Sequence, residues 1–217
     1  MFPIGDDDTQ RRTFPIVTYA LIALNVLMFL VELSGGDQFV NDWAFIPKRF
    51  SAEPAAYAVT IFTAMFMHAS WFHLFGNMLF LWIFGDNVED RFGHVQFLIF
   101  YLLVGVAATL AQFVMAPHSG LPNLGASGAI AGVLGAYILM FPQERVNVLL
   151  GPQIVAMPAV IVIGLWIALQ LFSGVGSIAH THGTTDVGGV AYMAHIGGFF
   201  AGFLLTFLFR GPSGAQT

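Results

Sequence analysis

Residues 190–209 read VAYMAHIGGFFAGFLLTFLF, a run of twenty residues without Asp, Glu, Lys or Arg. A helix rises about 1.5 Å per residue, so about 20 apolar residues cross the hydrocarbon layer of a bilayer, which is roughly 30 Å thick. This stretch therefore predicts a transmembrane helix. Together with five further apolar stretches, the predicted spans are Phe14–Leu33, Trp71–Gly85, Val95–Met115, Ser127–Phe141, Gln153–Phe172 and Val190–Phe209.

The composition agrees with a membrane protein. Of the 217 residues, 57% are hydrophobic and only 9% charged, and the mean hydropathy is +0.79. A soluble domain carries about 25% charged residues, so most of this surface is expected to face lipid. The net charge of −5 includes no basic run, which argues against a nucleic-acid partner. The absence of Cys excludes disulfides, thiolate metal sites and cysteine nucleophiles.

We expect one membrane domain, residues 14–210, between polar tails at 1–13 and 211–217. The first span follows two arginines, as a signal peptide would. It is longer than the 7–15 residues of a secretory core and lacks a cleavage site, so we expect it to be retained. The connection from Ser34 to about Ser70 is rich in aromatic residues, which predicts short helices at the membrane interface.

Basic residues are unevenly divided between the two sides of this topology. Two lie on one side, Lys48 and Arg49, and five on the other: Arg11, Arg12, Arg91, Arg145 and Arg210. The positive-inside rule then predicts a multi-pass protein of the cell membrane with both termini in the cytoplasm.

Few polar side chains interrupt the spans, and such groups are costly in lipid unless they are partnered or face a cavity. They are His73, Asn77, Ser127, His195, Asn25, Gln112 and Gln170. The first four lie near the starts of spans two, four and six, which all begin at the outer face. Three helices thus bring a hydroxyl, two imidazoles and an amide to one depth. Since His73 and Asn77 are four residues apart, they share a helix face.

Ser127 stands in Gly-Ala-Ser-Gly at a helix start, where free backbone N–H groups favour a developing negative charge. Small residues four apart let membrane helices pack closely, and such pairs occur at Gly128/Gly132 and Gly198/Gly202. His195 shares a face with the second pair, so a hydrogen bond between Ser127 and His195 is geometrically reasonable. Taken singly, the Ser127 motif and His195 fit contacts between helices better than catalysis, and the pair His73 and Asn77 fits both equally well. Their common depth favours a shared site.

The remaining histidines point to no metal site. His68, His94 and His118 are expected in loops, and His180 and His182 supply two ligands where a metal needs three or four. There is no His-Glu-x-x-His motif. We therefore expect neither metal nor cofactor.

At these residues the sequence resembles the rhomboid intramembrane serine proteases. The matching segments, within about Trp43 to Phe209, are His68, His73–Asn77 (HLFGN), Glu89–Gly93, Gly125–Gly128 (GASG) and Ala194–Gly198 (AHIGG). The resemblance implies a six-transmembrane-helix bundle, a dyad of nucleophile Ser127 and base His195, and an oxyanion hole of His73, Asn77 and the Ser127 N–H. It also implies that about Gly174 to Gly189 cap a water-filled cavity.

Two features depart from this pattern. Many members carry, at the position of Ala131, an aromatic residue that packs on the histidine, and some carry a Trp-Arg pair in the first loop; this chain has neither.

The sequence thus predicts an all-α polytopic membrane protein that hydrolyses peptide bonds of single-span membrane proteins near the outer face. Its expected partners are transmembrane-helix substrates and the lipid bilayer. A small-solute transporter could use the same polar residues to line a pathway, although the chain lacks the repeated halves of many transporters. The third interpretation, an inactive binder of membrane helices, would be favoured had Ser127 or His195 been replaced.

Overall fold

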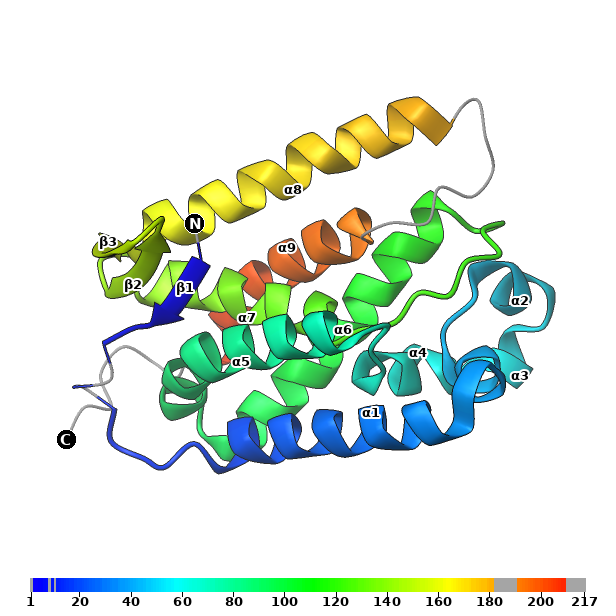
Figure 1. Cartoon of the computed structure of the whole chain (residues 1–217), viewed down its shortest axis with the longest axis horizontal. Coiled ribbons are helices and arrows are strands. Elements are labelled where there is room, and N and C mark those ends of the chain that lie inside the picture. The colour runs from blue at the N-terminus through cyan, green and yellow to red at the C-terminus, as the bar shows by residue number, and fades with distance from the viewer. Residues whose placement is uncertain (1, 8, 10, 182–190, 210–217) are drawn as a thin grey trace.

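The computed structural model describes residues 2–7, 9, 11–181 and 191–209, which form a bundle of helices with a small sheet at one end (Figure 1). Each predicted span overlaps one helix of the bundle. These helices are α1 (Ile16–Trp43), α5 (Trp71–Phe92), α6 (His94–Met115), α7 (Ser127–Met140), α8 (Ala159–Thr181) and α9 (Tyr192–Phe209). Of these, α1, α5 and α8 extend beyond the predicted ends. The prediction of an all-α fold is wrong in one respect, since a three-stranded antiparallel sheet is present. Its order is β1 (Phe2–Gly5), β2 (Arg145–Leu150) and β3 (Gln153–Pro158).

The helices differ in their ability to cross a membrane. Among the described residues, α1, α6 and α9 are long and apolar enough, and the pair Pro54–Phe66 and Trp71–Phe92, bent by 76°, makes a fourth span if counted as one. With 14 residues, α7 reaches only about 21 Å. The apolar part of α8, Ala159–Gly174, is also short. The chain is a membrane protein whose described part holds three helices of spanning length, or four spans if the bent pair counts as one. The six-span topology stays a prediction.

Helix α7 lies at the centre of the bundle. All ten residues from Gly128 to Tyr137 are buried, and the helix contacts α5, α6, α8 and α9. A helix that is apolar on every side is stable when other elements surround it. Protein therefore covers α7 along its length, and Ser127 begins a helix inside the bundle.

Glycines bring α7 and α9 together backbone to backbone. A methyl group at Gly198 would overlap the carbonyl oxygen of Gly128, and one at Gly202 would overlap that of Gly132. The two predicted pairs of small residues thus face each other, and the close packing expected from the sequence is present.

The predicted start of the fifth span is wrong. Gln153–Pro158 is strand β3, paired with β2 along its whole length, and α8 begins only at Ala159. Gly151 makes the turn between the strands with φ of 58°, a conformation that favours glycine. An apolar run containing β-branched Ile154 and Val155 suits a strand as well as a helix, so hydropathy alone does not separate them.

The N-terminal residues form structure where a tail was expected. β1 pairs with β2, and Asp6 accepts hydrogen bonds from the Tyr137 hydroxyl at 2.6 Å and the Asn87 amide at 2.8 Å. Nearby, Glu89 accepts hydrogen bonds from the backbone N–H and the hydroxyl of Thr18, both at 2.7 Å. The last turns of α5 therefore hold the start of α1, which has no side-chain cap of its own.

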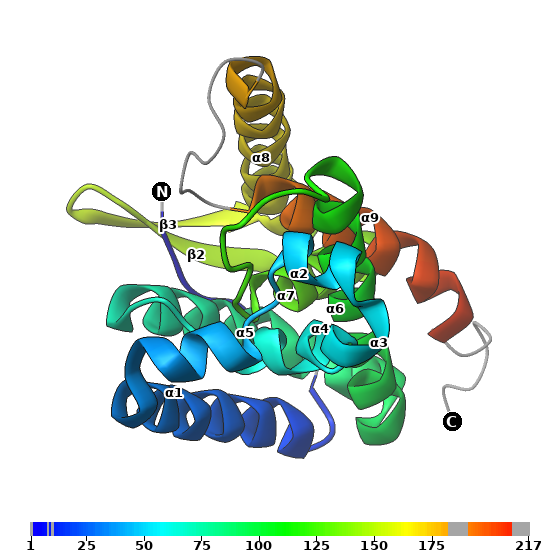
Figure 2. The same ribbon diagram turned by 90° about the vertical axis from the view of Figure 1, so that its right-hand side faces the viewer.

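The end of the bundle away from the sheet carries the short helices expected for the first loop (Figures 1 and 2). They are α2 (Pro47–Ala52), α3 (Pro54–Tyr57), α4 (Thr60–Thr63) and the 3₁₀ helix η1 (Ala64–Phe66). α1 is interrupted at Gly36, with φ of 60°, before it reaches them. Lys48 and Arg49 belong to this end, whereas four of the five residues predicted for the other side belong to the sheet end: Arg11, Arg12, Arg91 and Arg145. The fifth, Arg210, lies outside the described residues.

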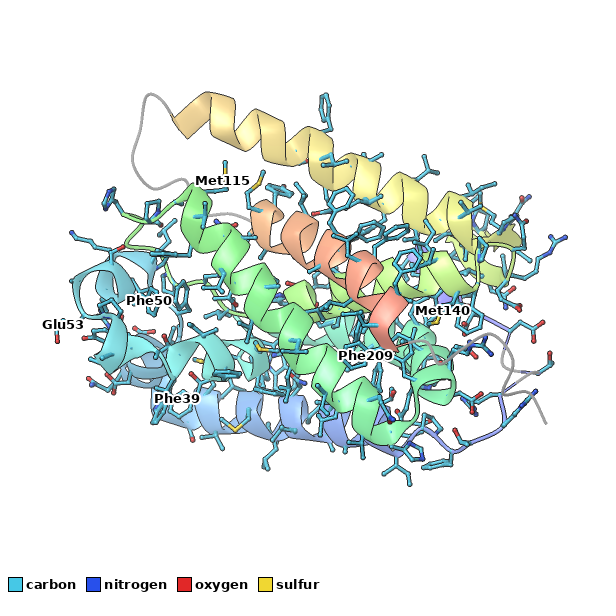
Figure 3. The ribbon with its side chains drawn as sticks, turned by 180° about the vertical axis from the view of Figure 1, so that it is seen from behind. Phe39, Phe50, Glu53, Met115, Met140 and Phe209 are labelled. Atoms are coloured by element: carbon cyan, nitrogen blue, oxygen red, sulfur yellow. The ribbon has the colours of Figure 1, made fainter. Side chains whose placement is uncertain are left out.

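The labelled side chains of Figure 3 show how α7 and α9 are oriented. Met140 and Phe209, the last residues of these helices, lie at one end of the bundle, opposite Phe50 and Glu53 of the first loop. Both helices therefore begin toward the short helices, on the side where α6 ends at Met115.

Candidate active site

The segment before Ser127 is fixed by the first loop. Phe45 and Asn123 exchange two backbone hydrogen bonds of 3.1 and 2.7 Å, and the Ser51 hydroxyl donates to the Pro117 carbonyl at 2.7 Å. The Gly125 N–H donates to the Ala64 carbonyl at 2.9 Å. The short helices thus hold residues 116–126, and with them the start of α7.

Ser127 begins α7 directly after a backbone bend at Gly125, whose φ is 129°. The first N–H groups of a helix have no acceptor within the helix and carry the positive end of its dipole. A Cβ atom placed on Gly125 would lie 2.9 Å from Nε2 of His73 and 3.5 Å from Oγ of Ser127. Only glycine fits between these side chains. Because Gly125 has no Cβ atom, His73 can approach Ser127.

His73 and Asn77 occupy the first two turns of α5. Ser70 caps this helix, because its hydroxyl accepts the His73 N–H at 3.1 Å. Asn77 is buried, and its Nδ2 has no hydrogen-bond partner among the described residues. A buried amide N–H without a partner costs about 1–3 kcal/mol, so a donor left in this state is available for a ligand.

His195 lies in the first turn of α9, three residues before Gly198 and its contact with α7. No hydrogen bond joins it to Ser127 in the described part of the chain. Instead, Nδ1 of His195 lies 2.8 Å from Oε1 of Gln170. The Trp166 ring packs on the imidazole, with ring centroids 5.8 Å apart and an interplanar angle of 36°. Both supporting side chains come from α8.

One cleft of about 940 Å³ joins these residues. Among the residues that line it are Ser127, His195, His73, Asn77 and Trp166. The four polar side chains predicted to converge thus face the same space. Most of the remaining lining is apolar, as in Phe80, Ile130 and Leu134, which suits a segment of an apolar polypeptide.

The other histidines lie apart from this arrangement or beside it. His68 is buried, its ring 5.2 Å from that of His73, and its backbone N–H donates to Glu32 at 2.9 Å. His94 pairs with Glu89 at the other end of α5. In the ranges that the structure describes, no group of three or more His, Asp or Glu could hold a metal ion. The predicted cap reaches into residues 182–190, which lie outside the described ranges, and its beginning is the end of α8.

Comparison with known protein families gives one match that covers more than half of the chain. The Rhomboid domain matches residues 55–212, a range that contains His73, Asn77, Ser127 and His195. The chain belongs to the rhomboid family.

Curated rhomboid relatives come from bacteria and from organelles. The chain is 35% identical to Rhomboid protease GluP of Bacillus subtilis, over 86% of this chain and 34% of the relative. It is 29% identical to Rhomboid protein 1, mitochondrial, of Saccharomyces cerevisiae, over 90% of this chain and 54% of the relative. It is 30% identical to Rhomboid-like protein 11, chloroplastic, of Arabidopsis thaliana, over 67% of this chain and 50% of the relative. The chain spans between a third and about half of the length of these relatives.

The support of His195 in this rhomboid was missed by sequence reasoning. Ala131 of α7 is fully buried and brings only a methyl group. The aromatic ring on the histidine is supplied by Trp166 of α8 instead. From the sequence, Gln170 is recognisable only as a polar residue within a span. Its spacing of four residues from Trp166 was the available signal, since it places both side chains on one helix face.

Proposed function

We propose that the chain is an intramembrane serine endopeptidase in which Ser127 is the nucleophile and His195 the general base. The observation that carries this proposal is the cleft, because side chains from α5, α7 and α9 meet there in the combination that acyl transfer needs. Membership of the rhomboid family, and the printed name of the bacterial relative as a protease, support the same activity.

The reaction would proceed in two steps. Ser127 Oγ attacks the scissile carbonyl carbon while Nε2 of His195 takes the hydroxyl proton, and the amide C–N bond breaks as the imidazolium gives that proton to the leaving nitrogen. Water then attacks the acyl-enzyme with His195 again as base, which releases the new carboxyl end and restores Ser127. Neither step needs a metal or cofactor.

His73, Asn77 and the Ser127 N–H would stabilise the oxyanion. Such donors act most strongly when they are fixed before the charge develops and when water is excluded. The unpartnered Nδ2 of Asn77 and the position of His73 beside Gly125 support this role. The tetrahedral intermediate would accept a hydrogen bond from a donor that has no partner within the described part of the chain.

The proposed substrates are single-span membrane proteins. In a membrane helix each peptide carbonyl is hydrogen-bonded internally, so the substrate must unwind before Ser127 can attack it. Unwinding is easiest near helix-weakening residues such as Gly and Pro. The glycine-lined surroundings of Ser127 favour a small side chain just before the cut.

The site of cleavage follows from the orientation. α7 and α9 begin at the end with the short helices, where the basic residues are fewer. With both termini in the cytoplasm of a cell-membrane protein, as the Lys and Arg count predicts, cleavage takes place near the outer face. Relatives named as mitochondrial or chloroplastic occupy other membranes, so this location is tested separately by labelling of engineered cysteines on intact cells.

The test is labelling and cleavage by the purified protein in detergent. A fluorophosphonate probe should label the wild type and Ser34→Ala, whose hydroxyl lies outside the cleft lining, but not Ser127→Ala. Ser127→Ala and His195→Ala should each abolish cleavage of a single-span reporter, and the double variant should be no worse, because members of one catalytic unit are not additive. Turnover in either folded single variant would refute the dyad. Retained reporter binding without labelling of the wild type would favour an inactive binder.

A further inference from the structure

The side chain of Gln170 contacts the ring of His195 inside the bundle. We propose that Gln170 is a positioning residue, whose amide oxygen accepts the Nδ1–H of His195 and so leaves Nε2 free to take the proton of Ser127. This inference rests on the proposed function, because it concerns the histidine in its role as base.

The chemistry of the contact selects one tautomer. Oε1 of Gln170 lies 2.8 Å from Nδ1 of His195, and an amide oxygen can only accept. A neutral imidazole carries one N–H proton. When that proton is on Nδ1, Nε2 is unprotonated and its lone pair can accept a proton. In the opposite tautomer Nε2 carries the proton, and Nε2 is then unable to accept the hydroxyl proton of Ser127.

An amide suits this place better than a carboxylate. Soluble serine proteases fix the tautomer with a buried Asp. A charge within an apolar bundle is costly, whereas a neutral amide gives the same hydrogen bond without that cost. His195 is only 9% exposed, and beside it the titratable side chains that line the cleft are His73 and Glu32. Of these two, Glu32 accepts the backbone N–H of His68 at 2.9 Å.

Trp166 completes the support from the same helix. It precedes Gln170 by one turn, so both side chains project from one face of α8. Its ring covers the imidazole at 5.8 Å and also contacts Phe199, one turn further along α9. The hydrogen bond fixes which nitrogen faces Ser127, and the indole restricts rotation of the ring. α9 carries the base, and α8 sets its orientation.

The test compares three variants in the full-length protein. Gln170→Met keeps the length of the side chain and removes the acceptor, and Gln170→Glu keeps an acceptor and adds a charge. Gln112→Met is the matched control, because it removes a partly buried amide of α6 that, unlike that of Gln170, makes no hydrogen bond to His195 among the described residues. For each variant, kcat, KM, the pH dependence of kcat and the melting temperature are measured with the reporter.

We expect Gln170→Met to lower kcat by about 10- to 100-fold with KM nearly unchanged, the range found when a partner that orients a histidine is removed from a metal site. Gln170→Glu should retain more of kcat, and its acidic limb should move to higher pH, since a neighbouring carboxylate favours the protonated imidazole. A purely structural role would lower the melting temperature without moving that limb.

Equal kcat in Gln170→Met and Gln112→Met would overturn the inference, and so would an unmoved acidic limb in an active Gln170→Glu. The proposed function is tested apart from it. If His195→Ala is inactive while Gln170→Met is fully active, only the role of Gln170 is refuted; if His195→Ala is active, both fail.

Discussion

Gly128→Ala is expected to impair catalysis more than stability, because it changes the packing directly beside the nucleophile. A Cβ atom on Gly128 would lie 2.6 Å from Cβ of Ala108 on α6. Carbon atoms in contact are normally 3.5–4.0 Å apart, so the two helices must separate by about 1 Å at this point. Ala108 is buried at 1% exposure, and its methyl group cannot rotate away. The start of α7 has to move instead.

The magnitudes follow from that displacement. Overpacking lowers the free energy of unfolding by about 1–3 kcal/mol, and the higher helix propensity of Ala raises it by about 1 kcal/mol. The net loss of stability should therefore be no more than about 2 kcal/mol. A misplacement of about 1 Å in a catalytic group costs on the order of 100-fold in rate. We therefore expect kcat to fall by about 100-fold while the protein stays folded.

The assay measures kcat, fluorophosphonate labelling and thermal unfolding in detergent. Gly164→Ala in α8 is the matched control, because an added Cβ there meets nothing within 4 Å. It should keep wild-type kcat and unfold at the same or a slightly higher temperature. If Gly128→Ala has the kcat of Gly164→Ala, the contact with α6 does not position Ser127 and the reasoning is refuted.

Three further predictions concern the same site. Asn77→Ala should lower kcat by about 10²- to 10³-fold, as loss of an oxyanion donor does, and a change in thermal stability alone would make Asn77 structural. Gly125→Ala should lower kcat and stability together, because its Cβ would lie 2.7 Å from Cε1 of His73 at a φ of 129°; wild-type values in both measurements would contradict the tight fit. Saturating chelator should leave cleavage unchanged, and loss of activity restored by zinc would implicate His180 and His182 as ligands.

The helices could largely be predicted from the sequence, since hydropathy reports burial in lipid directly. The span predicted as Val95–Met115 is α6, His94–Met115, and the span predicted from Val190 begins two residues later as α9. The hairpin could not be predicted, because its apolar strands satisfy the same hydropathy criterion as a helix. The short length of α7 also has a physical explanation that needs the fold: surrounding helices, rather than lipid, cover it.

The candidate site divides in a similar way. His73, Asn77, Ser127 and His195 could be selected because polar groups are rare in the spans, and their meeting in one cleft agrees with the common depth expected. The partners of His195 depend on how α8 is rotated about its own axis. That rotation is set by packing against α9, so Gln170 and Trp166 became recognisable only with the fold.

The pairing of β1 with β2 imposes an order on biosynthesis. Phe2 lies opposite Leu149, so β1 has no partner strand until α1, α5, α6 and α7 have been made. At about 5–20 residues per second, the ribosome needs roughly 7–30 seconds for that interval. The entropy lost in closing so long a connection grows only slowly with its length, so the delay adds little to the cost of pairing. Docking of the first strand therefore follows the translation of α7, α6 and α5, whereas α8 and α9, which also pack on α7, come after β2 in the chain.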